Sequence, residues 1–116
     1  MTVDPDQYVI RGGLATPESL IVGVGPVLGH DFSGFSTVTA AGLSLEELAM
    51  AARYLNRTVS YTTAGSLIRL GYEVAPTPFP RMPLHASVIT PNPLPLEEAV
   101  ALSLAFSSKI SNPWKP

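Results

Sequence analysis

Runs of alternating polar and apolar residues predict several short strands along this chain. Residues 7–11 alternate in this way and end at two glycines, which suits a strand with a sharp exit. β-branched and aromatic side chains favour strands over 34–39 and 58–62, and an apolar run without proline predicts a central strand over 84–90. The segment 72–75 predicts one more strand before a proline-rich stretch. The pattern therefore predicts about five or six short strands.

Helical periodicity is strongest over residues 45–55. Apolar side chains recur there three and four residues apart, and Ser44 and Glu47 fit a capping box at the start. We expect Asn56 to end this helix. A second long helix is predicted over 96–109, because acidic residues occupy its first turn and a lysine stands at its end.

Two further segments are shorter and less regular. Thr16 followed by Pro17 is typical of a helix start, whereas residues 20–24 are β-prone, so a helical turn and a strand both fit there. Residues 63–70 predict a short helix. Strands and helices do not alternate strictly, which favours the α+β class over a doubly wound parallel sheet. We therefore predict a single α+β domain over residues 1–116, with two or three helices.

The chain has few charged residues for its size. Of its 116 residues, 14% are charged and 46% are hydrophobic, whereas soluble domains carry about 25% charged residues. A surface poor in charge exposes more apolar area, which is typical of partner interfaces. The predicted helix over 96–109 is apolar around most of its circumference, which points the same way. Composition therefore favours a homo-oligomer or a partner-bound domain as one interpretation.

Charge and cysteine content exclude several classes of function. The net charge is −2 and the seven basic residues are scattered, which disfavours nucleic-acid binding. The absence of cysteine excludes disulfides and thiolate nucleophiles, and two histidines without an H-E-x-x-H motif leave no expected metal site. No apolar run is long enough to span a bilayer, and the first residues are unlike a signal peptide. We expect a cytoplasmic protein with no membrane partner, and secretion by a specialised system stays open.

Three of the predicted strands carry side chains suited to binding a phosphate-bearing ligand. Arg11 stands at a strand end beside Gly12, where a planar guanidinium can approach phosphate. Ser36 and Thr37 follow each other on a strand, so only one of them can line a given cleft. His85 lies in an apolar strand, where an imidazole can donate to a ribose hydroxyl or act as a general base. Each of these residues also fits an ordinary structural role.

Five short segments carry a family resemblance. They are Tyr-Val-Ile-Arg-Gly at 8–12, Phe-Ser-Thr at 35–37, Ala-Gly-Ser-Leu-Ile-Arg at 64–69, Tyr-Glu-Val-Ala-Pro at 72–76, and the segment 85–93, which begins with His and ends in Pro-Asn-Pro. Together they resemble the ADP-ribosyltransferase fold, in particular small bacterial antagonism toxins with this fold, including type VI secretion effectors. The resemblance implies a bent or split mixed β-sheet with NAD held in a cleft.

The resemblance also implies contacts with the cofactor, NAD. Arg11 would hold the pyrophosphate or a ribose, with Gly12 leaving room for the ligand. Ser36 or Thr37 would support the nicotinamide ribose, and Tyr61 would lie beside the same cleft. A nucleotide is therefore the expected ligand. A toxin of this kind also implies an immunity or antitoxin protein as its partner.

Arg11, Glu73 and His85 are the catalytic residues expected on this resemblance. Cleavage of the nicotinamide–ribose bond develops oxocarbenium character, which a carboxylate near the ribose stabilises. Glu73 is the acid that the pattern places on a strand away from a helix cap, and it or His85 would lie near the reacting carbon. The Glu-x-Glu or Gln-x-Glu pair that Arg-Ser-Glu transferases carry on a late strand is absent.

Two functions follow from the sequence. The first is a small NAD- or nucleotide-using toxin-like enzyme of bacterial antagonism, of the ADP-ribosyltransferase or NAD glycohydrolase type. Because the carboxylate pair is missing, nucleotide binding without transfer of ADP-ribose also fits this interpretation. The second is a non-catalytic oligomeric or partner-binding α+β interaction module, which the low charge and the apolar second helix favour.

Overall fold

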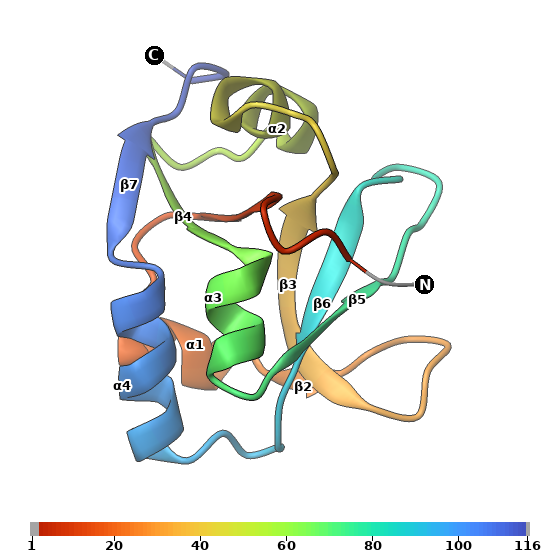
Figure 1. Cartoon of the computed structure of the whole chain (residues 1–116), viewed down its shortest axis with the longest axis vertical. Coiled ribbons are helices and arrows are strands. Elements are labelled where there is room, and N and C mark those ends of the chain that lie inside the picture. Colours follow the sequence, from red (N-terminus) through yellow and green to blue (C-terminus); the bar gives the residue numbers. More distant parts are fainter. Residues whose placement is uncertain (1–2, 116) are drawn as a thin grey trace.

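The computed structural model describes residues 3–115 of the chain. The strands are β1 (Tyr8–Gly12), β2 (Gly25–Pro26), β3 (Ser33–Thr39), β4 (Thr58–Thr63), β5 (Glu73–Pro76), β6 (His85–Ile89) and β7 (Ser108–Ser111). The helices are α1 (Pro17–Gly23), α2 (Leu45–Ala52), α3 (Ala64–Arg69) and α4 (Leu96–Ala105). The strands form one antiparallel sheet in the order β5-β6-β3-β1-β4-β7, with β2 paired to β3 (Figure 1).

Two hydrophobic cores lie on opposite faces of this sheet. Neighbouring strand residues point to opposite faces, and Val9 and Ile10, both fully buried, belong to different cores. Helices α1, α3 and α4 bury apolar side chains in the core that contains Val9, whereas α2 packs on the core that contains Ile10. Figure 1 shows α2 apart from the other three helices. The predicted α+β class is therefore confirmed, with helices on both faces of the sheet.

Three helices begin at a side-chain cap. The hydroxyls of Thr16, Ser44 and Thr63 accept hydrogen bonds from backbone N–H groups three residues later, and the predicted capping box at Ser44 is present in full. The ambiguous segment after Thr16 is helical as far as Gly23. Its cap and the buried side chain of Leu20 outweigh the β-propensity of its branched residues.

The C-terminal helix is shorter than the sequence predicts. Helix α4 ends at Ala105, whereas the pattern predicts a helix over 96–109. Ser108–Ser111 forms strand β7, which pairs with β4 and brings Ile110 to the core beneath α2. The consecutive serines Ser107 and Ser108 weaken a helix, because their hydroxyls compete for backbone hydrogen bonds. The edge of β4 provides backbone hydrogen bonds for residues 108–111 in place of those of a longer helix. Lys109 therefore lies on an edge strand and not at a helix end.

Helix α2 and the sheet also differ from expectation in detail. Helix α2 ends at Ala52, and Arg53 caps it in the left-handed region with a φ of 53°, whereas the pattern predicts Asn56 as the end. Residues 3–115 contain four helices and seven strands, more than the pattern predicts. Every ladder between these strands is antiparallel, unlike the mixed sheet that the resemblance implies. Strand β6 is paired on both edges, as predicted.

The sheet is split beside β3. One edge of β3 pairs with β6 from Gly34 to Val38. The other edge pairs with β2 at Ser33 and Gly34, and with β1 at Val38 and Thr39. Among the described residues, 35–37 therefore have no strand partner on that second edge. Strands β1 and β2 pair with opposite ends of this edge, and the Arg11 side chain bonds to the carbonyl oxygen of Ser36 between them.

Candidate functional site

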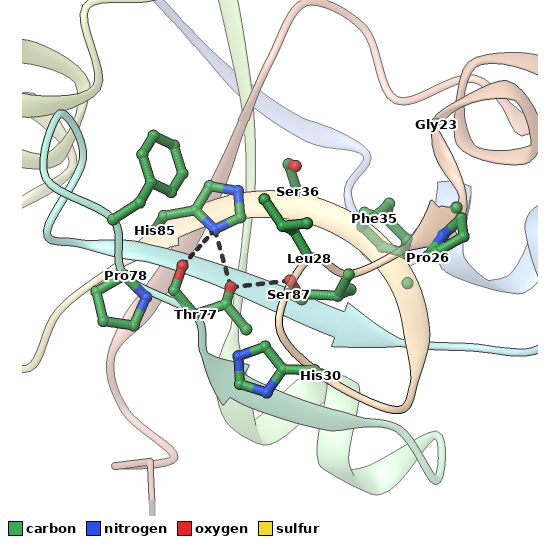
Figure 2. A pocket seen from close by; sticks show the side chains of 14 residues that line it. Gly23, Pro26, Leu28, His30, Phe35, Ser36, Thr77, Pro78, His85 and Ser87 are labelled. Atoms are coloured by element: carbon green, nitrogen blue, oxygen red, sulfur yellow. Dashed lines mark hydrogen bonds between the residues drawn. The ribbon is translucent and has the colours of Figure 1, made fainter.

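A pocket of about 480 Å³ lies between the loop that joins β2 to β3 and the segment that follows β5 (Figure 2). Leu28 and His30 line it from the loop, and Thr77 and Phe79 line it from the segment after β5. Strands β3 and β6 contribute a second wall, and the end of α1 and strand β2 complete the lining. Imidazole and hydroxyl groups thus share the pocket with apolar and aromatic side chains, a composition typical of small-molecule sites.

The register of β3 and β6 places Ser36 and His85 on the same face of the sheet. Ser36 lies directly opposite Ser87, and His85 lies opposite Val38, so Ser36 and His85 are diagonal neighbours. Both residues line the pocket, and Ser36 is exposed. The structure therefore brings together two of the residues that the sequence predicts for binding and catalysis.

His85 is held by hydrogen bonds to the segment after β5. Its Nδ1 lies 2.8 Å from Thr77 Oγ1 and 3.0 Å from the Thr77 carbonyl oxygen. Thr77 Oγ1 lies 2.9 Å from Ser87 Oγ, and both of these hydroxyl residues are buried. The ring of Phe79 packs against the imidazole, with 4.9 Å between ring centroids. The imidazole is thus fixed in one orientation at the edge of the pocket.

Arg11 fills the split in the sheet and lies behind the pocket wall. Its Nη1 donates to the Ser36 carbonyl oxygen at 2.9 Å, and its Nη2 donates to the Ser19 carbonyl oxygen at 3.4 Å. The guanidinium lies over the ring of Phe35, 5.3 Å from its centroid, and Phe35 lines the pocket. Arg11 is therefore connected to the pocket through Ser36 and Phe35 but does not line it.

Burial shifts the pKa of Arg11 and the pKa of its neighbour Tyr54. Loss of hydration lowers the pKa of Arg11, and the nearby Tyr54 hydroxyl opposes this shift. Burial raises the pKa of Tyr54 to about 12, against the smaller opposing effect of Arg11. The guanidinium keeps its charge, because arginine does not lose its proton in proteins. A positive charge bonded to neutral carbonyls thus stands directly behind the pocket.

Thr37 and Tyr61 lie away from the pocket. Thr37 is fully buried, and its Oγ1 donates to the carbonyl oxygen of Ala86 at 3.0 Å. Tyr61 packs edge-on against Tyr8, with 5.9 Å between ring centroids, on the side of the sheet that α2 covers. Of the adjacent pair, Ser36 is therefore the residue that lines the pocket, and the buried side chain of Thr37 points to the other face of the strand.

Glu73 and Gly12 also lie outside the pocket lining. Glu73 is exposed at the start of β5, opposite Ile89, and strands β6 and β3 separate β5 from the strand of Arg11. The space beside Gly12 is occupied, since a Cβ there would lie 2.6 Å from Asn56 Oδ1. The structure therefore does not bring Glu73 and Gly12 to the pocket that Ser36 and His85 line.

Sequence reasoning missed several residues that line the pocket. Thr77 holds the imidazole, Ser87 bonds to the Thr77 hydroxyl, and Phe79 packs on the imidazole ring. A signal for Thr77 was present, because it stands between Pro76 and Pro78, and two prolines fix the backbone of the residue between them. Ser87 and Phe79 carry no comparable signal, since their role depends on the register of β6 and on the turn before it.

Two other kinds of site are not found in the part of the chain that the structure describes. Within residues 3–115, no group of three or more histidine or acidic side chains is placed to hold a metal ion. None of the helices over the same residues combines the length and the hydropathy that crossing a membrane requires.

Comparisons with known proteins add no relative to these observations. No family model, curated protein or solved structure matches the chain. The pocket and its residues are therefore the features that bear on function, because one fold supports many activities.

Proposed function

We propose that this pocket binds a nucleotide, with NAD as the candidate cofactor, and that the chain is a small toxin-like enzyme of bacterial antagonism. The supporting observation is that Ser36 and His85 line one pocket while the Arg11 guanidinium donates to the Ser36 carbonyl oxygen. A hydroxyl and an imidazole suit sugar hydroxyls or an amide, and the apolar faces of Phe79 and Leu28 suit a planar base.

The proposed reaction is cleavage of the nicotinamide–ribose bond, with water or a target side chain as the acceptor of the ribose carbon. In this reaction nicotinamide leaves as the neutral base with the electron pair of the broken bond, and the attacking group bonds to the ribose carbon. His85 accepts the proton of the attacking group, and the Ser36 hydroxyl forms a hydrogen bond with the ribose. Because Glu73 lies far along the sheet from Arg11, we assign no carboxylate to the developing positive charge. The proposed place of action is the cytoplasm, and an immunity protein is the proposed partner.

Binding is tested by calorimetric titration of the protein with NAD, using two neighbouring substitutions. Ser36→Ala removes a hydroxyl from the pocket, whereas Thr37→Ser keeps the hydroxyl that donates to Ala86 on the opposite face. We expect Ser36→Ala to weaken NAD binding about tenfold, the effect of losing one hydrogen bond worth about 1.4 kcal/mol. Thr37→Ser should bind as the unchanged chain does. No NAD binding by the unchanged chain would reject the proposal.

Toxicity is tested by expression in bacteria. We expect the unchanged chain to arrest growth and His85→Ala to relieve the arrest at equal protein levels, because the imidazole lines the proposed site. Harmless expression of the unchanged chain contradicts the toxin part of the proposal. The titration with NAD is independent of this result and decides the nucleotide-binding part.

A second candidate function, that of a partner-binding module, is favoured by the outer face of α4. Leu96, Val100 and Leu104 recur there every four residues, with exposed fractions of 63%, 43% and 69%. Sedimentation velocity separates the two functions. A stable oligomer that does not bind NAD favours the module, whereas a monomer that binds NAD favours the enzyme.

A further inference from the structure

We propose that Thr77 holds His85 in the tautomer with its hydrogen on Nδ1, so that Nε2 faces the pocket as a hydrogen-bond acceptor. In the NAD complex, before the attacking group takes its place at Nε2, the ligand must then present an O–H or N–H group to His85, such as a sugar hydroxyl or a carboxamide. Thr77 is a positioning residue in this arrangement, because it acts on the ligand through His85. The ligand part of the inference rests on the proposed nucleotide binding, whereas the tautomer does not.

The carbonyl oxygen of Thr77 decides which ring nitrogen carries the hydrogen. It lies 3.0 Å from His85 Nδ1, and a carbonyl oxygen can only accept a hydrogen bond. With no hydrogen on Nδ1, two lone pairs would face each other at this distance, which is repulsive. A hydrogen on Nδ1 converts the same contact into a hydrogen bond. A neutral imidazole has a single N–H, so Nε2 keeps its lone pair.

The hydroxyl of Thr77 agrees with this assignment. Its Oγ1 lies 2.8 Å from Nδ1 and accepts a share of the same N–H, which leaves its own hydrogen for Ser87 Oγ at 2.9 Å. The opposite arrangement, in which Oγ1 donates to Nδ1, would leave the carbonyl contact repulsive. His85 Nδ1 therefore donates to Thr77 Oγ1, and Thr77 Oγ1 donates to Ser87 Oγ, so neither bond involves Nε2.

The backbone prevents the Thr77 carbonyl from turning away. The N–H of Thr77 donates to the His85 carbonyl oxygen at 3.0 Å, and only 6% of Thr77 is exposed. Pro76 and Pro78 restrict the backbone on both sides, and Pro76 is still paired with Ala86 in the sheet. The tautomer is thus set by the fold itself, before any ligand binds.

The second ring nitrogen is the one available to a ligand. In Figure 2 the dashed lines leave Nδ1 toward Thr77, while the other nitrogen lies at the far edge of the ring, on the side of Ser36. An acceptor in this position repels the oxygens of a phosphate or a carboxylate. The Ser36 hydroxyl can donate or accept, so His85 is the group that selects the hydrogen-bonding character of the ligand.

The tautomer is measured by long-range ¹H–¹⁵N correlation spectra of the ligand-free protein labelled at histidine. The chain contains two histidines, so in the His30→Ala variant every histidine signal belongs to His85. With the ring neutral, we expect Nδ1 at the chemical shift of a protonated nitrogen and Nε2 at that of an unprotonated one. The reverse assignment, or an even mixture, would overturn the inference.

Thr77→Val separates the carbonyl from the hydroxyl. It removes Oγ1, nearly conserves the shape of the side chain and keeps the backbone carbonyl that lies 3.0 Å from Nδ1. We expect the hydrogen to stay on Nδ1, because the carbonyl alone requires it. A shift of the hydrogen to Nε2 in this variant would contradict the argument from the carbonyl. Ser87→Ala, which touches only the far end of the chain of hydroxyls, should leave both nitrogens unchanged.

Addition of NAD tests the ligand part. A donor group of the ligand should move the Nε2 resonance and leave Nδ1 in place. Binding of NAD, seen by calorimetry, with an unchanged Nε2 contradicts a donor at His85. If NAD does not bind and the free protein carries its hydrogen on Nδ1, the proposed nucleotide function fails while the assignment of the tautomer is supported.

Discussion

Gly34 shows how little space the sheet leaves behind the pocket. A Cβ on this residue would press directly on the backbone carbonyl of Val88 on the neighbouring strand β6. We expect Gly34→Ala to lower the free energy of unfolding by about 1–3 kcal/mol, because a backbone ladder cannot yield as a flexible side chain does. Urea denaturation measures the effect.

Gly25 is the matched control for this substitution, since it pairs with Gly34 and a Cβ there would meet no atom within 4 Å. Gly25→Ala should change the free energy of unfolding by less than about 0.5 kcal/mol. Equal losses in the two variants would show that the close contact at Val88 does not decide the choice of glycine.

Arg11 holds the split sheet together as well as standing behind the site. Arg11→Ala removes the donors to the carbonyl oxygens of Ser36 and Ser19, and within residues 3–115 no strand covers that edge at Ser36. We expect the free energy of unfolding to fall by about 1.5–3 kcal/mol, the usual range for hydrogen bonds to a charged group. Arg81→Ala, at an exposed loop position, should change it by less than about 0.5 kcal/mol.

At the scale of elements, α4 carries two leucines with opposite environments. Leu102 is fully buried in the core beside α1 and α3, whereas Leu104 is 69% exposed. We expect Leu102→Ala to cost about 2–5 kcal/mol of unfolding free energy, and Leu104→Ala to cost less than about 0.5 kcal/mol. Thermal and urea denaturation of the isolated variants measure both. A large loss at Leu104 would mean that its face is covered in solution.

The helices also show which element boundaries the sequence pattern predicts and which it does not. Three helices start at Thr16, Ser44 and Thr63. These starts depend on hydrogen bonds between residues three apart in the chain, so the local sequence is enough to predict them. The end of α4 does not follow, because the choice between one more helical turn and strand β7 depends on an edge of β4 that lies about fifty residues earlier in the chain. Local pattern therefore predicts where elements begin better than where they end.

At the scale of the whole molecule, alkaline pH tests the burial of Tyr54. Its pKa is about 12 in the folded chain against 10.0 as the ordinary value, so the folded state holds the proton more tightly than the unfolded state. This stabilisation is complete below pH 10 and is lost as the pH rises from about 10 to about 12. Urea denaturation across this range should show unfolding free energy falling by up to about 1.4 kcal/mol per pH unit from this group.

Tyr54→Phe is expected to flatten this fall, because the substituted ring has no proton to lose. Tyr72 contributes in the same direction, since burial and the hydrogen bond that its hydroxyl donates to Glu98 raise its pKa. A variant of Tyr54 with the pH slope of the unchanged chain would assign the whole effect to other groups.

The candidate site was predictable only in part, for a geometric reason. Ser36 and His85 share a face because of the pairing register of β3 and β6, which the alternation in each strand makes plausible but does not fix. The place of Glu73 depends on the strand order, which puts β5 at the edge of the sheet. The sequence does not predict that the guanidinium of Arg11 donates to backbone carbonyl oxygens, because this contact depends on the split in the sheet.

The position of β7 in the chain has a consequence for biosynthesis. Residues 108–111 leave the ribosome after strands β1 to β6, and until then the edge of β4 that pairs with β7 has no partner strand. An open edge of this kind recruits strands from other chains. The open edge of β4 therefore exposes the nascent chain to aggregation until β7 emerges. Asn112 follows directly and donates to the carbonyl oxygens of Tyr54 and Asn56, which ties the end of β7 to the segment before β4.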